Sequence, residues 1–131
     1  YVALAVRMLK DRLDIDHLDM NFGCPAPKVT RNGGGAAIPV KRRLLGSIVE
    51  SAVKAAGDVP VTIKFRKGID DHHLTFLDSG RIAQEAGCVG VTLHARTAKD
   101  LYSGHADWGA ITQLVEHIDI PVFGNDICFR T

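Results

Sequence analysis

VPVTIKFRKGIDDHHLTFLDSGRIAQEAGCVGVTLHAR, residues 59–96, predicts a complete strand–helix–strand unit. Its segments 59–65 and 89–94 are short apolar runs rich in β-branched residues, as strands are. Between them, 74–86 repeats apolar residues at helical spacing and is followed by Gly87, a common helix terminator. Parallel strands need a crossover of this kind, so the unit predicts a parallel sheet covered by helices.

The same alternation continues on both sides of this unit. Further strand-like runs occupy 15–22 and 118–123, and helix-like segments occupy 41–57 and 108–117. Asp107 directly precedes the last helical segment and is suited to cap it. Four strands that alternate with helices fit two fold classes, an open doubly wound sheet or part of a (β/α)8 barrel.

Polar residues distinguish these two classes, because they follow the carboxyl ends of all four strands. Asn21 lies near the end of the first strand and Cys24 follows it, and Lys64 lies near the end of the second. His94 ends the third strand, and Asn125 follows the fourth. Barrels build their active sites at this rim from several successive strands, whereas doubly wound sheets use one switch point and often a G-x-G-x-x-G turn. That turn is absent here, so we predict an α/β fold, a partial TIM (β/α)8 barrel of about four βα units.

Composition indicates an ordinary folded protein of the cytoplasm. Hydrophobic residues make up 46% of the 131 residues and charged residues 24%. No apolar run approaches the ~20 residues that span a bilayer, so no membrane association is expected. Three cysteines without a C-x-x-C spacing suit a reducing compartment. The chain opens within an apparent helix and ends just after a strand, which suggests a fragment.

Cys24 and Lys64 give the sharpest chemical signals. Cys24 follows a strand, between Gly23 and Pro25, where an exposed thiol could donate a proton or act as a nucleophile. A small buried apolar residue is the alternative. Lys64 interrupts an apolar strand, where its charge costs desolvation unless an anion meets it. A reduced flavin ring would supply that anion, and an ammonium that reaches water at the rim is the alternative.

The ends of the third and fourth strands add further candidates. His94 could donate to a phosphate or to flavin polar atoms, or it could be a hydrogen-bonded core residue. Arg96 could bind a phosphate or stack on a base, or it could be a solvent-exposed loop cation. Gly124-Asn125-Asp126 could bind phosphate, as loops after the last barrel strands often do, or form an ordinary turn.

Positive charge is concentrated in the first half of the chain. Residues 1–66 hold 11 Lys and Arg against 6 Asp and Glu, and 67–131 hold 5 against 9. The basic loop 28–31 and the cluster 41–43 flank the cysteine loop and could contact a nucleic-acid backbone. A solvated helix start is the alternative. The remaining histidines show no metal-site spacing, so no metal is expected.

Four motifs, taken in order, resemble those of tRNA-dihydrouridine synthases. They are MNFGCPAPKVTRNGGGAAI (20–38), VTIKFRKG (61–68), VTLHARTAKDLYSGHADWGAI (91–111) and IPVFGNDI (120–127). They resemble that family's cysteine loop, lysine strand, histidine strand and phosphate loop. The first and third are long and specific, and the resemblance spans nearly the whole chain.

The resemblance implies FMN-dependent reduction of uridine to 5,6-dihydrouridine in tRNA, with NADPH or NADH as hydride donor. Cys24 matches the general acid that protonates C5 of the uridine. Four positions match flavin and FMN phosphate contacts: Lys64, His94, Asn125 and Asp126. Two match positions near the flavin and the substrate base: Asn21 and Arg96.

The chain departs from the family in one motif and in extent. It reads Gly124-Asn125-Asp126 where the family usually reads Gly-Asn-Gly-Asp, so a permissive backbone position near the phosphate is lost. The family's first strands and its C-terminal helical domain have no counterpart in 1–131, so we expect an internal fragment that binds flavin poorly and is inactive alone. Two other functions stay open: an FMN barrel acting on free dihydropyrimidines or dihydroorotate, and a non-catalytic remnant.

Overall fold

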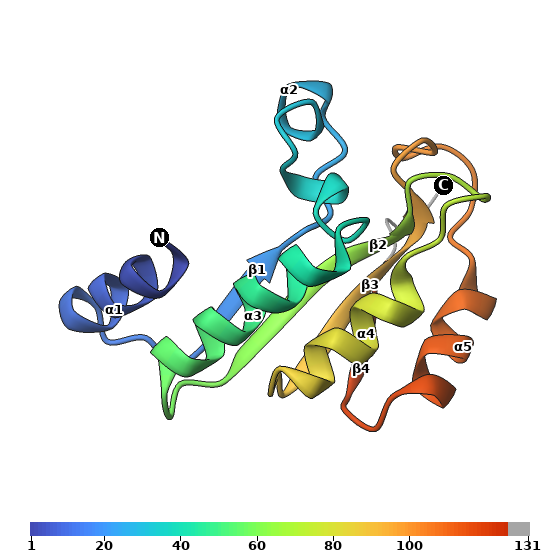
Figure 1. The fold of residues 1–131 in the computed structure, drawn as a ribbon. Helices are drawn as coiled ribbons and strands as arrows, with labels where there is room; N and C mark the ends of the chain where they lie inside the picture. Colours follow the sequence, from blue (N-terminus) through green and yellow to red (C-terminus); the bar gives the residue numbers. More distant parts are fainter. Residues whose placement is uncertain (126–131) are drawn as a thin grey trace, which may run out of the picture.

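A computed structural model describes residues 1–125 of the chain. Its four strands form one parallel sheet in the order β1-β2-β3-β4, so each strand pairs with the next one in sequence (Figure 1). The strands are β1 (Leu18–Asn21), β2 (Val61–Gly68), β3 (Gly90–Thr97) and β4 (Val122–Asn125). The helices are α1 (Val2–Arg12), α2 (Pro27–Thr30), α3 (Arg42–Ala56), α4 (Phe76–Glu85) and α5 (Trp108–His117), with a short 3-10 helix η1 (Gly35–Ala37).

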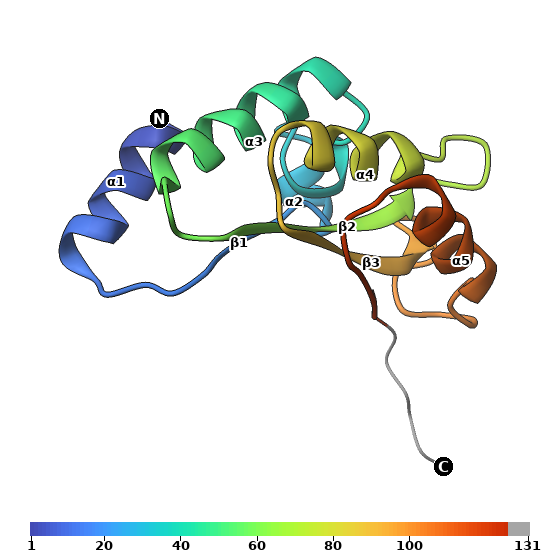
Figure 2. The same ribbon diagram turned by 90° about the horizontal axis from the view of Figure 1, so that it is seen from below.

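The crossover helices all lie on one face of the sheet. Figure 2 shows α3 and α4 on the same side of the strands, and α5 packs next to α4 against β3 and β4. A doubly wound sheet reverses its strand order at a switch point and carries helices on both faces. Sequential strand order with helices on one face is instead the arrangement of a (β/α)8 barrel. The predicted fold class, a partial TIM barrel of four βα units, is confirmed.

The apolar core lies between the sheet and these helices. Alternate residues of β2 and β3 enter it, and α3 supplies a stripe at helical spacing against them. The fully buried residues of the core include Ile63, Phe65, Val91, Leu93, Leu45 and Val49. The intervening residues of the strands point to the opposite face, which is the interior side of a barrel. The sequence therefore places its unusual polar residues on that interior face.

The observed strand bounds differ from those predicted by hydrophobicity alone. β2 and β3 continue three residues past their apolar runs, to Gly68 and Thr97, because they keep pairing with each other there. The last strand starts at Val122, since Ile118 instead is the C-cap residue of α5 and packs in the core. Asp107 caps α5 as predicted, accepting a hydrogen bond from the N–H of Ala110 at 3.1 Å. Within the described residues no helix has the length and hydrophobicity to cross a membrane.

Candidate active site

A pocket of about 270 Å³ opens at the carboxyl ends of the four strands. Its lining comes from all four strands and from the loops after β1 and β3. The lining residues are Asn21, Gly23, Cys24, Pro25, Lys64, Arg66, His94, Tyr102 and Asn125. Five of the predicted site residues thus meet in one place: Asn21, Cys24, Lys64, His94 and Asn125. Arg96 lies outside the lining, and Asp126 lies outside the described residues.

Register explains why residues so distant in sequence converge. In the sheet, Asn21 pairs with Lys64, and His94 pairs with both Arg66 and Asn125. Parallel strands bring paired residues to the same level, and alternation sends their side chains to the same face. The chemical residues therefore form two neighbouring rows at the rim, which is the geometry that the sequence predicted.

The loop after β1 is turned sharply enough to bring Cys24 to the pocket. The side chain of Asn21 accepts a hydrogen bond from the N–H of Gly23 at 2.8 Å, which turns the chain directly after the strand. The chain then folds back, and the N–H of Ala36 donates to the carbonyl of Cys24 at 2.9 Å. Gly35 packs against that same carbonyl with a φ of 52°, a conformation that favours glycine. The thiol is half-buried at the pocket wall as a result.

Replacement of Gly35 by alanine is expected to lower the free energy of unfolding by about 2–3 kcal/mol. The new methyl group would collide with the carbonyl and Cβ of Cys24, and the residue would also hold an unfavourable φ. Gly104→Ala is the matched control, because its φ is 69° but nothing lies within 4 Å of the added methyl group. It should cost about 1 kcal/mol in urea unfolding. Equal losses for both variants would show that close packing at Cys24 is unimportant.

Lys64 carries a partly desolvated charge into the pocket. Burial lowers the pKa of Lys64 from its usual value, nearby Arg66 lowers it further, and Asp19 opposes both effects. No carboxylate among residues 1–125 forms a salt bridge with its ammonium. An anionic ligand in the pocket would compensate this desolvation and would raise the pKa again. Lys64 therefore has the properties of an anion-binding group.

Arg66 is a pocket residue that sequence reasoning did not single out as a site. Its side chain is 3% exposed and donates three hydrogen bonds to backbone carbonyls. Nε donates to Gly23 at 2.9 Å, and Nη1 donates to Thr97 at 2.9 Å and Leu101 at 2.8 Å. Its position two residues after Lys64 was the available signal, because residues i and i+2 of a strand share a face.

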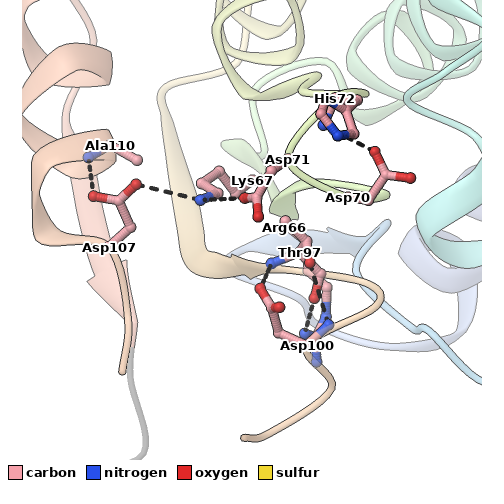
Figure 3. Close-up of polar contacts among 9 residues, drawn as sticks. All are labelled: Arg66, Lys67, Asp70, Asp71, His72, Thr97, Asp100, Asp107 and Ala110. Carbon is pink, nitrogen blue, oxygen red and sulfur yellow. Dashed lines mark hydrogen bonds and ion pairs between the residues drawn. The ribbon is translucent and has the colours of Figure 1, made fainter. Parts of the chain in front are cut away.

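Tyr102, the second residue that the sequence did not single out, lies on the loop 98–107. This loop is fixed at several points. Thr97 and Asp100 exchange hydrogen bonds at its start, and Lys67 pairs with Asp107 at its end at 3.3 Å (Figure 3). The ring of Tyr102 lies 5.4 Å from the guanidinium carbon of Arg66, within cation–π range. The loop therefore presents an aromatic ring to the pocket.

Arg96 is not the exposed loop cation that the sequence left as an alternative. It is 5% exposed, because β3 continues to Thr97 and the loop 98–107 folds against it. Its Nη2 donates to the carbonyl of Gly104 at 2.9 Å, and Nη1 lies 3.4 Å from Nε2 of His94. Arg96 thus supports the loop and contacts His94, which is itself buried at the pocket wall.

The two cysteines of the described residues differ sharply in environment. Cys24 is half-buried at the pocket, whereas Cys88 is 4% exposed and packs in the core. Burial raises the pKa of the Cys88 thiol to about 11, with a smaller contribution from Asp19. At pH 8 such a thiol is a thiolate in roughly one molecule in a thousand. Cys88 is therefore unsuited to chemistry at neutral pH.

Iodoacetamide at pH 8 is expected to modify Cys24 at least about 100-fold faster than Cys88, because the thiolate is the reactive form. Mass spectrometry of tryptic peptides, taken at several times, separates the two sites. In urea, where burial is lost, both cysteines should react at similar rates. Similar rates in the folded protein would contradict the environments described here.

Comparisons with known proteins agree on one family. The model of a family described as dihydrouridine synthase (Dus) matches residues 1–130. The chain is 59% identical over 124 residues to a probable tRNA-dihydrouridine synthase of Mycobacterium tuberculosis, which covers 92% of this chain and 32% of that protein. It is 41% identical over 108 residues to tRNA-dihydrouridine synthase B of Pseudomonas syringae pv. tomato, covering 82% and 32%. The chain spans about a third of the length of these relatives.

Proposed function

We propose, because the chain belongs to the dihydrouridine synthase family, that it acts in the FMN-dependent reduction of uridine to 5,6-dihydrouridine in tRNA. NADPH or NADH would be the hydride donor, and the cytoplasm the compartment. One observation carries the proposal: Cys24, Lys64 and His94, from three separate segments, line one pocket together with Asn21 and Asn125. A non-catalytic remnant would not be expected to retain these five residues in one pocket.

The donor groups in the pocket fit a flavin. Lys64 offers a desolvated cation, and His94 and Asn125 add polar groups for ring or phosphate-side atoms. A volume of about 270 Å³ is at the small end for ligand sites, so this pocket would enclose only part of the cofactor. When bound, FMN would supply the hydride for the reduction. Lys64, His94 and Asn125 are the residues that we assign to holding it.

Cys24 is the group that we assign to proton transfer. Saturation of the C5=C6 bond of uridine adds a hydride to C6 and a proton to C5. The thiol of Cys24 would give the proton to C5, and the resulting thiolate would regain one from water. A half-buried thiol at the pocket wall can reach a bound base and still exchange with solvent. Asn21 and the ring of Tyr102 line the same pocket and would help to orient the base.

The proposal is tested on the full-length protein, which is supplied with FMN, NADPH and a tRNA transcript that lacks dihydrouridine. We expect dihydrouridine in the digested tRNA, detected as a nucleoside heavier by two hydrogens. Parallel reactions contain dihydroorotate or free uracil, the substrates of the alternative function, an FMN barrel that acts on free small molecules. Turnover of these molecules with no product in tRNA would support that alternative and contradict the proposal. No turnover of any substrate would favour a non-catalytic protein.

A further inference from the structure

We propose that the connection from β1 to α3, residues 24–43, is a basic arm that binds the phosphate backbone of RNA beside the pocket. This inference rests on the proposed function, because it assigns a contact surface for the same tRNA substrate. It adds a contact surface beside the pocket, made by cations that take no part in the proposed proton transfer. Three features of the arm carry it: its charge, its position and its fixed geometry.

The arm carries positive charge without local compensation. From residue 20 to residue 49 the chain contains five cations and no Asp or Glu. They are Lys28, Arg31, Lys41, Arg42 and Arg43. All five are exposed. Of these five, only Arg42 forms a salt bridge within residues 1–125, with Asp78 at 2.6 Å. Four cations are therefore available to an external anion.

The arm begins at the wall of the pocket. Cys24 and Pro25, at the start of the arm, line the pocket. Figure 1 shows the segment that contains α2 projecting past the carboxyl ends of the strands, away from α4 and α5. A long nucleic acid that inserts one base into the pocket would have to pass this segment. Phosphates next to the inserted base would then lie close to Lys28 and Arg31.

The arm is internally fixed, so its cations keep a defined relation to Cys24. The N–H of Gly34 donates to the carbonyl of Val29 at 3.0 Å, and the amide of Asn32 donates to the carbonyl of Lys28 at 3.0 Å. A methyl group added at Gly34 would lie 3.1 Å from the side chain of Val29, so the turn is closely packed. The ammonium of Lys41 reaches back toward Gly33, so this cation lies beside the turn that follows α2.

RNA backbone is the partner that this chemistry fits. Unpaired Lys and Arg side chains bind phosphates without reading sequence, and they fix the register of the nucleic acid. A uridine must leave its stack to reach a pocket, which costs a few kcal/mol. Phosphate contacts beside the pocket would offset that cost while leaving base recognition to the pocket itself. An acidic polypeptide would satisfy the charge but would place no base beside Cys24.

The test compares tRNA binding by two charge variants with wild-type binding, using fluorescence anisotropy over a range of KCl concentrations. The arm variant combines Lys28→Ala, Arg31→Ala, Lys41→Ala and Arg43→Ala. We expect its affinity to fall roughly 30- to 300-fold at about 0.1 M salt, and the slope of log affinity against log salt to decrease by about 3.6, from about 0.9 for each of the four contacts. Each single alanine variant should decrease that slope by roughly 1.

The matched control removes three exposed cations at a distance, with Arg7→Ala, Arg12→Ala and Lys54→Ala. These residues lie on α1 and in the last turn of α3, well away from α2 (Figure 1). The control should bind tRNA within about 3-fold of wild type. Thermal unfolding of all variants should match wild type, because each altered side chain is exposed.

Three results would contradict the proposed role of the arm. They are wild-type tRNA affinity in the arm variant, equal losses of tRNA affinity in the arm and control variants, and competition by polyglutamate as strong as competition by RNA of equal charge. Failure of the proposed function is distinguishable from these. In that case the wild-type protein would still bind tRNA through the arm, with the expected salt slope, and yet form no dihydrouridine. Binding needs neither FMN nor a hydride donor, so the two readouts are independent.

Discussion

Arg66→Ala is expected to lower the free energy of unfolding by about 3–5 kcal/mol, a larger loss than for other single changes near the pocket. The guanidinium joins β2 to the loop after β1, through the carbonyl of Gly23, and to the end of β3 and its following loop, through the carbonyls of Thr97 and Leu101. Each charge-assisted hydrogen bond contributes about 1.5–3 kcal/mol, and alanine would leave all three carbonyls without this donor.

Desolvation of the guanidinium acts in the opposite direction. Burial lowers the pKa of Arg66, while the neighbouring Tyr102 opposes that shift, so the folded protein bears a cost for holding this charge. Alanine would recover the cost. Three well-made hydrogen bonds and the contact with the Tyr102 ring outweigh it, since their combined contribution is several kcal/mol. We therefore expect a net loss of stability.

Arg66→Lys and Arg81→Ala complete this experiment in urea unfolding. Lysine keeps the charge but lacks the planar fork that serves Gly23 and Thr97 at once, so it should restore less than half of the loss. Arg81→Ala removes an exposed arginine whose partner is Asp78, and it should change stability by under about 0.5 kcal/mol. A loss under about 1 kcal/mol for Arg66→Ala would mean that the loops after β1 and β3 hold their positions without it.

The fold could be predicted from the sequence because one feature repeats. Each strand is a short β-branched run, and each is followed by polar residues that a buried strand end would not otherwise carry. Parallel pairing brings such ends to one edge, so the convergence of Cys24, Lys64 and His94 followed from topology alone. The ends of β2 and β3 did not follow, because their last residues include the buried arginines Arg66 and Arg96, which a hydropathy pattern assigns to the surface.

The parts of the site that escaped prediction depend on contacts between loops. Tyr102 stands in an irregular segment, and its place at the pocket depends on Arg66, the Thr97–Asp100 turn and a positive φ of 53° at Leu101. None of these contacts produces a periodic pattern in the sequence from which it could be predicted. Arg96 was assigned near the substrate base from resemblance, and its burial behind His94 suits support of the loop. Its role, like that of every assigned site residue, stays a prediction.

Cys24→Ala is expected to slow dihydrouridine formation by about 10²- to 10⁴-fold, the range for loss of a general acid. The methyl group has no proton to give to C5 of the uridine, while the pocket loses one sulfur atom and little else. The carbonyl of Cys24, which accepts from Ala36, is retained, so the loop keeps its anchor. Binding of tRNA and unfolding in urea should therefore stay close to wild type.

Cys88→Ala is the control that separates chemistry from packing. It removes a thiol of the same kind from the core, where it should lower stability by about 1 kcal/mol and leave the rate per folded molecule unchanged. Cys24→Ser should remain slow, because a hydroxyl is a far weaker acid than a thiol. If Cys24→Ala forms dihydrouridine within a few-fold of the wild-type rate, the proton reaches C5 from another donor at the pocket. His94 and Tyr102 would then be the groups to replace next, since both line the pocket and carry exchangeable protons.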